Sequence, residues 1–158
     1  MSRDGSRDFD WEIGTWATHV KVLRGAFTPD ATWIEFTGTS VVHAFCGGAS
    51  NLVELDVAGA SGRIQGVSLR LYNPEARQWS LNFANMGDGL LTPPTYGEFA
   101  GERGEFFGVD TLGGRAILVR FVILRLSDDS ARFEQSYSAD SGNTWELTWV
   151  ATDTRVTS

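Results

Sequence analysis

The chain has 158 residues, of which 42% are hydrophobic, and it includes six Trp and ten Phe. This length and composition predict one folded domain over residues 1–158 and exclude general disorder. The formal net charge of −7 disfavours phosphate backbones and anionic lipid, and no apolar run approaches the ~20 residues of a membrane helix. We therefore expect neither nucleic acid nor a membrane as a partner.

The first distinctive stretch runs over residues 8–16 and is rich in aromatic side chains. Phe9, Ile13 and Trp16 recur at helical spacing, which predicts a short N-terminal helical plug across one end of a barrel. Gly14 can end that helix, and an extended run follows it.

Short alternating segments separated by Gly- and Pro-containing turns fill the rest of the chain. Regular short strands joined by hairpins, without long crossovers, favour an all-β fold: a single antiparallel up-and-down β-barrel of about ten strands. The longest irregular connection, 86–94, is expected at the open mouth of this barrel. The predicted strands cover residues 15–23, 32–45, 51–57, 64–72, 78–84, 96–99, 105–109, 117–126, 132–138 and 144–150.

The last predicted hairpin carries a sharper motif. Residues 138–145 match the Asp-box pattern Ser-x-Asp-x-Gly-x-Thr-Trp at every fixed position. Asp140 can accept hydrogen bonds from turn amides, and Gly142 can supply a positive φ. Because the motif occurs once, in a chain too short for a propeller, we interpret it as an Asp-box hairpin staple and not as a glycosidase site.

Several motifs along the chain together resemble a family of uncharacterised bacterial calycin-like proteins. Gly14-x-Trp16 resembles the calycin signature, in which the Trp seals the barrel floor. The resemblance implies a lipocalin-like barrel and no agreed activity. The motifs are Asp8-Phe9-Asp10-Trp11-Glu12-Ile13-Gly14-x-Trp16, Glu35-Phe36-x-Gly38, Gly47-Gly48-x-x-Asn51, Leu69-Arg70-Leu71-Tyr72-Asn73-Pro74, Gln78-Trp79-Ser80, Pro93-Pro94-x-x-Gly97-x-Phe99, Val119-Arg120-Phe121 and Arg132-Phe133-Glu134-Gln135-x-Tyr137-Ser138.

Two related barrel families help to bound the cofactor prediction. Residues 24–31 are too few for the helix-turn-helix lid of fatty-acid-binding proteins. Nitrobindin-like barrels are similar in strand count and first Trp, which raises the question of haem. His19 and His43 are the only histidines, so no His cluster is available for zinc or iron. We expect no metal and no cofactor, with haem on a lone axial His as the minor alternative.

The single cysteine, Cys46, rules out an internal disulfide. It has no basic neighbour in sequence, so a small buried or half-exposed thiol is favoured over a nucleophile. The chain also opens without a basic-then-apolar leader. These features predict a reducing, cytoplasmic setting.

Polar side chains on the predicted strands are the candidates for a ligand site. On one reading they face water, and on the other some enter a ligand cavity. Arg120 stands on a strand that is apolar on both faces, so it needs a partner, and Glu134 on the next strand is the predicted one. The candidate ligand-binding residues are Arg70, Tyr72, Trp79, Asn82, Arg120, Glu134, Tyr137 and Trp149.

Three functions follow from this reading and stay open. The first is binding of a small apolar or aromatic molecule in the barrel interior. The second is a cofactor-free cyclase, isomerase or hydrolase that uses the same pocket. The third is a barrel filled by side chains that serves assembly. A homodimer is also left open. An empty cavity of several hundred Å³ argues against the third function, and a carboxylate of raised pKa inside the cavity favours the second.

Overall fold

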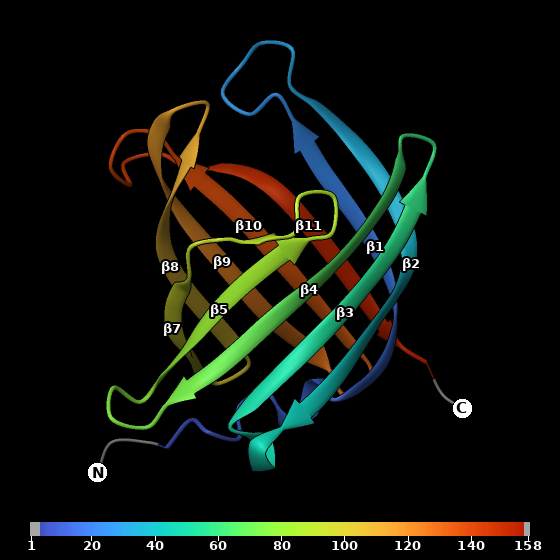
Figure 1. The fold of residues 1–158 in the computed structure, drawn as a ribbon, viewed down its shortest axis with the longest axis vertical. Coiled ribbons are helices and arrows are strands. Elements are labelled where there is room, and N and C mark those ends of the chain that lie inside the picture. The colour runs from blue at the N-terminus through green and yellow to red at the C-terminus, as the bar shows by residue number, and fades with distance from the viewer. Residues whose placement is uncertain (1–3, 157–158) are drawn as a thin grey trace.

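The computed structural model describes residues 4–156 and forms a closed antiparallel β-barrel (Figure 1). Ten strands follow one another around the barrel, and the pairing of β1 with β11 closes it. A further two-residue strand, β6, pairs only with the end of β5. The strands are β1 (Gly14–Arg24), β2 (Thr32–Phe45), β3 (Ser50–Gly59), β4 (Gly62–Asn73), β5 (Gln78–Asn85), β6 (Leu90–Leu91), β7 (Thr95–Ala100), β8 (Arg103–Leu112), β9 (Arg115–Ser127), β10 (Ser130–Ser138) and β11 (Glu146–Arg155).

The predicted ten-stranded barrel is confirmed, with one informative difference at its closure. The last strand was predicted to end at residue 150, whereas β11 continues to Arg155. Thr152 and Thr154 alternate with Ala151 and Asp153, so the period-2 pattern of the strand persists. These residues pair with the start of β1, where Trp16 lies opposite Arg155. The part of β11 that prediction left out therefore helps to close the barrel.

The predicted helical plug is not supported. The N-terminal segment contains only a single 3-10 turn, η1 (Asp10–Glu12). The segment nevertheless crosses the lower end of the barrel in Figure 1, and buried side chains hold it there. Phe9 is 2% exposed and packs edge-on against Trp79, with ring centroids 4.8 Å apart. Trp16 is fully buried and donates a 2.8 Å hydrogen bond from Nε1 to the carbonyl of Glu12.

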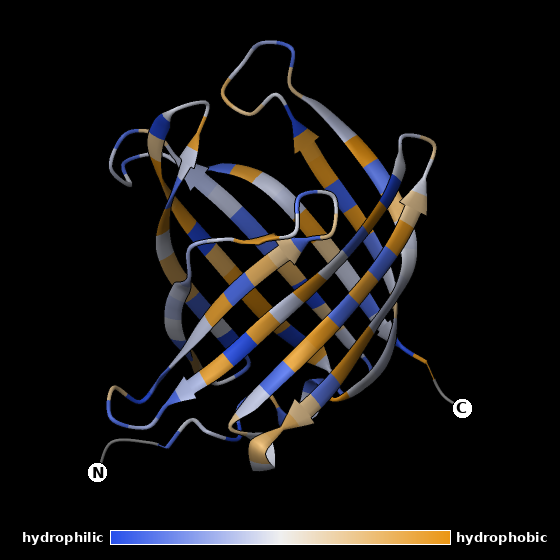
Figure 2. Cartoon of the chain, in the orientation of Figure 1, coloured by the Kyte–Doolittle hydropathy of each residue, from blue (hydrophilic) through white to orange (hydrophobic). Residues whose placement is uncertain are grey.

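Hydrophobic and hydrophilic residues alternate along the strands, as Figure 2 shows. Successive side chains of a strand point to opposite faces, so one file of each strand faces the interior. The core includes Trp79 and Phe106, which are fully buried and pack near Phe9 of the N-terminal segment. Among residues 4–156, no helix has the length and apolar character needed to cross a membrane.

The turn between β10 and β11 is built around one carboxylate. Asp140 accepts hydrogen bonds from the Thr144 hydroxyl (2.6 Å), the Thr144 backbone N–H (2.8 Å) and the Ser138 hydroxyl (2.8 Å). These bonds favour the ionised form, so they lower the pKa of Asp140 to about 2. Gly142 has a φ of +88° and donates its N–H to Ser138 Oγ. The carboxylate therefore organises both ends of the turn.

Replacing Asp140 by alanine is expected to lower the melting temperature, because it leaves the Thr144 donors without their acceptor. The native pKa lies below the ordinary value of 3.8, so this contribution is complete above about pH 4 and is lost as pH falls towards 2. Thermal melts at pH 7 and pH 2.5 check the result: the gap between wild type and Asp140→Ala should narrow at the lower pH. Equal melting temperatures at pH 7 would contradict the structural role.

Candidate functional site

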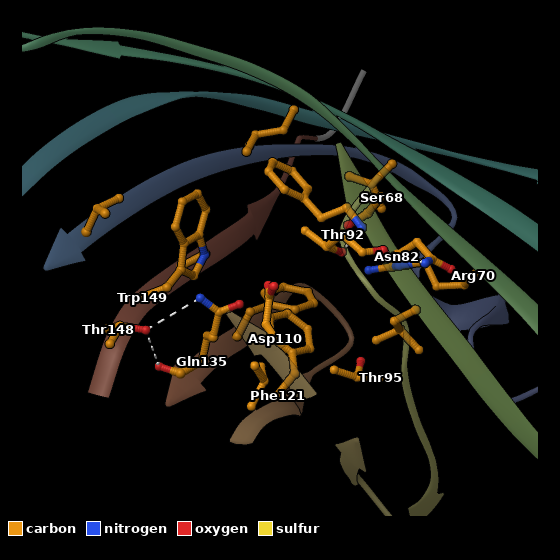
Figure 3. A pocket seen from close by; sticks show the side chains of 18 of the residues that line it. Ser68, Arg70, Asn82, Thr92, Thr95, Asp110, Phe121, Gln135, Thr148 and Trp149 are labelled. Atoms are coloured by element: carbon orange, nitrogen blue, oxygen red, sulfur yellow. Dashed lines mark hydrogen bonds between the residues drawn. The ribbon is translucent and has the colours of Figure 1, made fainter. Parts of the chain in front are cut away.

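An interior cavity of about 330 Å³ lies inside the barrel. Its walls are mainly apolar and include five aromatic side chains, four of which are Phe or Trp. Phe83 on β5 and Trp149 on β11 meet across the interior, with ring centroids 6.3 Å apart, and Figure 3 shows Trp149 and Phe121 on the same cavity. Phe121 also packs with Phe133 from the neighbouring strand at 6.3 Å. These walls suit an apolar or aromatic molecule.

A buried ion pair forms the inner end of the cavity, next to the N-terminal segment. Arg70 from β4 donates to both carboxylate oxygens of Glu12, at 2.6 and 3.3 Å. Their side chains are only 4% and 3% exposed. Arg70 also donates to Asn51 Oδ1 at 2.8 Å, and its guanidinium lies 4.7 Å from the centre of the Phe9 ring. The positive charge of Arg70 is thus already matched by Glu12.

A second buried carboxylate, Asp153 on β11, borders the same end of the cavity. It is 6% exposed, and its Oδ1 has no hydrogen-bond partner. Burial is the main cause that raises the pKa of Asp153, and with the added effect of the negative charge of Glu12 and the opposing effects of Thr18 and Arg70 the pKa is about 7. Thr18 is itself paired with the Ser40 hydroxyl at 2.7 Å. Asp153 can therefore exchange a proton near neutral pH.

Further polar groups lie along the wall formed by β8, β10 and β11. Gln135 Nε2 donates to the Tyr137 hydroxyl at 3.1 Å and to Thr148 Oγ1 at 3.4 Å. Thr148 Oγ1 donates in turn to the carbonyl of Gln135 at 3.2 Å, and Figure 3 shows the bonds between Gln135 and Thr148. Burial, together with the charge of Asp110, raises the pKa of Tyr137, so its phenol stays protonated at neutral pH.

The 86–94 connection leaves the upper end of β5 in Figure 1 and leads to β7. Asn82 Nδ2 donates to the carbonyl of Thr92 at 2.8 Å, and Thr92 Oγ1 accepts the Phe83 N–H at 3.0 Å. Thr92 and Pro93 both line the cavity. Leu90, on β6, is 70% exposed. The connection is therefore held to the barrel by Thr92, by the pairing of β6 with β5, and by the Met86 N–H, which donates to the Gln65 carbonyl at 2.8 Å.

We expect fast backbone hydrogen exchange in 86–94 and slow exchange in 117–124. Strand β9 is paired on both sides, whereas β6 pairs on one side with two residues of β5. Hydrogen exchange followed by mass spectrometry measures this directly. If 86–94 proved the more protected segment, its role as the entrance to the cavity would be wrong.

Four of the eight predicted ligand residues line the cavity: Arg70, Asn82, Tyr137 and Trp149. They come from β4, β5, β10 and β11, so the barrel gathers them from opposite walls. Two others, Tyr72 and Trp79, hold the N-terminal segment instead. Trp79 Nε1 donates to the Gly5 carbonyl at 2.9 Å, and the Tyr72 hydroxyl accepts the Gly5 N–H at 3.1 Å.

The last two predicted residues, Arg120 and Glu134, do not line the cavity, and their predicted pairing is wrong. Arg120 lies opposite Ser136, and Glu134 lies opposite Val122. Glu134 contacts Arg132 instead, with Oε1 at 3.4 Å from Nε. The Arg120 guanidinium stacks 4.5 Å from the centre of the Trp145 ring, which belongs to the β10–β11 turn. An aromatic ring thus shelters this charge in place of a carboxylate.

Sequence reasoning missed the carboxylates that define the charge of the cavity: Glu12, Asp110 and Asp153. Glu12 was quoted only as part of a family motif. Asp153 fell beyond the predicted end of the last strand, although the alternation of Thr152 and Thr154 was a usable signal. Nothing local to Asp110 separates it from a surface aspartate.

The two histidines lie away from the cavity. His43 is exposed, and His19 lies 3.7 Å from Glu35. Neither is among the residues that line the cavity. A haem in this cavity would lack an imidazole ligand from residues 4–156. Within the same residues, no group of three or more His, Cys, Asp or Glu side chains is arranged to hold a metal ion.

The fold and the cavity define a ten-stranded antiparallel β-barrel with an internal pocket, and solved structures of other proteins share this fold. The S-type phycobiliprotein lyase CPES from Guillardia theta aligns over 99% of this chain and 94% of its own, with 12% identity and a TM-score of 0.63. EF1p2_mFAP2b bound to DFHBI aligns over 96% and 99%, with 12% identity and a TM-score of 0.51. No family model matches the chain, and no curated protein matches it.

Proposed function

We propose that the protein binds one small, largely apolar or aromatic molecule inside the barrel. The observation that supports this proposal is the cavity of about 330 Å³, which has aromatic walls and a polar inner end. Ligand pockets generally combine apolar walls with a few polar groups that fix orientation. Here Arg70 Nε and Asp153 Oδ1 are buried polar atoms that lack partners. A bound molecule could supply a hydrogen-bond partner at this end of the cavity.

The structural neighbours support this proposal at the level of the fold. One of them was solved bound to the small molecule DFHBI, and the other is named as a phycobiliprotein lyase. Both share the barrel at 12% identity, so neither identifies the ligand of this chain. The cavity also argues against the third function, a barrel filled by side chains.

The test is a titration with Prodan, a neutral naphthalene dye whose emission shifts to the blue in apolar surroundings. We expect saturable binding at one site per chain. Ser68→Phe places a bulky ring in the cavity and should weaken binding at least about tenfold. The matched control is Ser80→Phe, because Ser80 lies on β5 but is not one of the residues that line the cavity; this variant should bind as wild type does. Equal binding by both variants would overturn the proposal.

An enzymatic use of the same pocket is the second candidate, and Asp153 is the observation that favours it. A carboxylate of pKa about 7 in an apolar cavity is matched to general acid–base catalysis at neutral pH. A hydrolase of this kind should turn over an activated ester such as 4-nitrophenyl acetate. Its rate should rise with pH through about 7 and be lost in Asp153→Asn. A rate unchanged by that substitution would reject the candidate.

We also propose a family and a cellular compartment for the protein. We place it among bacterial calycin-like proteins of the cytoplasm, on the sequence motifs and the single cysteine, and we leave a homodimer open. The net charge of −7 disfavours nucleic acid and anionic lipid as partners.

A further inference from the structure

The charges that line the cavity are strongly unequal. Glu12, Asp110 and Asp153 contribute three carboxylates, whereas Arg70 contributes the one cation among the lining residues of the described chain. With all four ionised, the lining carries a net charge of −2. A charge in an apolar interior is costly unless it is paired, so this lining favours a cationic ligand and disfavours an anionic one.

Arg70 keeps one guanidinium nitrogen, Nε, without a hydrogen-bond partner, but its charge is already paired. Glu12 holds its guanidinium through two hydrogen bonds, Asn51 accepts a third, and the Phe9 ring lies 4.7 Å from its central carbon. An anionic ligand would therefore meet an arginine whose charge is already neutralised, with two further carboxylates nearby. A fatty acid or an aromatic acid fits this cavity poorly.

Asp153, in contrast, has a carboxylate oxygen without a hydrogen-bond partner. Its side chain is 6% exposed, and Oδ1 accepts no hydrogen bond. Asp110 differs in being only partly buried, and its Oδ1 accepts the Thr111 N–H at 2.7 Å. The strongest site for a donor in the cavity is thus Asp153, at the end opposite the entrance.

We propose that the ligand is a protonated amine on an aromatic or apolar frame, with its ammonium group bonded to Asp153 and its frame between Phe83, Phe121 and Trp149. This inference rests on the proposed function and names the ligand class for the same cavity. The amine donates to Oδ1 and neutralises part of the cavity charge, and the aromatic walls enclose the rest of the molecule.

Binding of an ammonium group should be coupled to proton release. Asp153 must be ionised to pair with a cation, and its pKa of about 7 means that much of it is protonated at pH 6. The charged and titratable groups that face the cavity with it are Glu12 from η1, Arg70 from β4, Asp110 from β8 and Tyr137 from β10. The affinity for the amine should therefore rise between pH 6 and pH 8.

Three ligands of matched size separate the possibilities: 1-naphthylmethylamine, 1-naphthylmethanol and 1-naphthoic acid, measured by calorimetry with wild-type protein at pH 8. We expect the amine to bind at least about tenfold more tightly than the alcohol, and the acid to bind most weakly. Asp153→Asn should bring the amine to the affinity of the alcohol. Glu134→Gln, on the outer face, is the matched control and should leave all three affinities unchanged.

The outcomes distinguish the proposed ligand class from the proposed function, which is binding in the pocket. If the alcohol or the acid binds as tightly as the amine, the ligand class is wrong while the pocket stands. The same holds if Asp153→Asn, shown to be folded by circular dichroism, keeps the preference for the amine. If none of the three ligands binds and Prodan does not bind either, the proposed function itself fails.

Discussion

Arg70→Met is expected to lower the free energy of unfolding by about 3–5 kcal/mol, the usual cost of leaving one member of a buried ion pair alone. Glu12 would be left at 2% exposure without its cation, and Asn51 Oδ1 would lose its donor. Urea unfolding at pH 7, followed by tryptophan fluorescence, measures the change. The double variant Glu12→Gln/Arg70→Met should recover part of the loss, because no unpaired charge is left behind.

Arg63→Met is the matched control, since Arg63 lies on the same strand and also makes two hydrogen bonds to one carboxylate. Its partner Asp56 is on the outer face, and both side chains are well exposed, at 57% and 40%. Solvent screens such a pair, so its loss should have little effect. An Arg70→Met protein as stable as Arg63→Met would mean that the inner end of the cavity is open to water.

Asp153→Asn is expected to raise stability at pH 8 and to flatten its dependence on pH. The native pKa of about 7 lies above the ordinary 3.8, so the folded protein binds the extra proton. The free energy of unfolding should therefore fall as pH rises from about 4 to 7, by about 4 kcal/mol for this one group. Below pH 4 the aspartate is protonated in both states, and the variant gains nothing.

A series of urea unfolding curves from pH 4 to pH 8, for wild type and Asp153→Asn, isolates this contribution. The difference between the two proteins should be small at pH 4 and reach its full size above pH 7. A constant difference over the whole range would show that Asp153 titrates at its ordinary value, and hence that the carboxylate is hydrated.

The barrel could be predicted because strand periodicity is a local property. Alternation of apolar and polar residues, interrupted by Gly and Pro, marks each strand without reference to its neighbours. The prediction of an N-terminal helical plug was wrong because it also relied on local spacing alone. Phe9, Ile13 and Trp16 do recur at helical spacing, yet the chain makes one 3-10 turn there, because Phe9 and Trp16 pack into different parts of the barrel floor.

The candidate site was harder to predict, because which face of a strand points inward depends on the whole barrel. On β4 the polar residues Ser68 and Arg70 face the cavity, while Leu71 is 44% exposed. A half-buried strand normally has the opposite arrangement. The partner that makes this acceptable, Glu12, lies 58 positions away in the chain. The partner of Arg120 was also not predictable, because the register between β9 and β10 sets its distance from Glu134 and no local pattern determines that register.

The central claim is that the interior of the barrel is a ligand pocket, and a crystal structure of the protein soaked with Prodan tests it most directly. We expect density for the naphthalene ring inside the barrel, in contact with Phe83, Phe121 and Trp149. Density for the dye only on the outer face, or side chains that close the cavity of about 330 Å³, would contradict the claim.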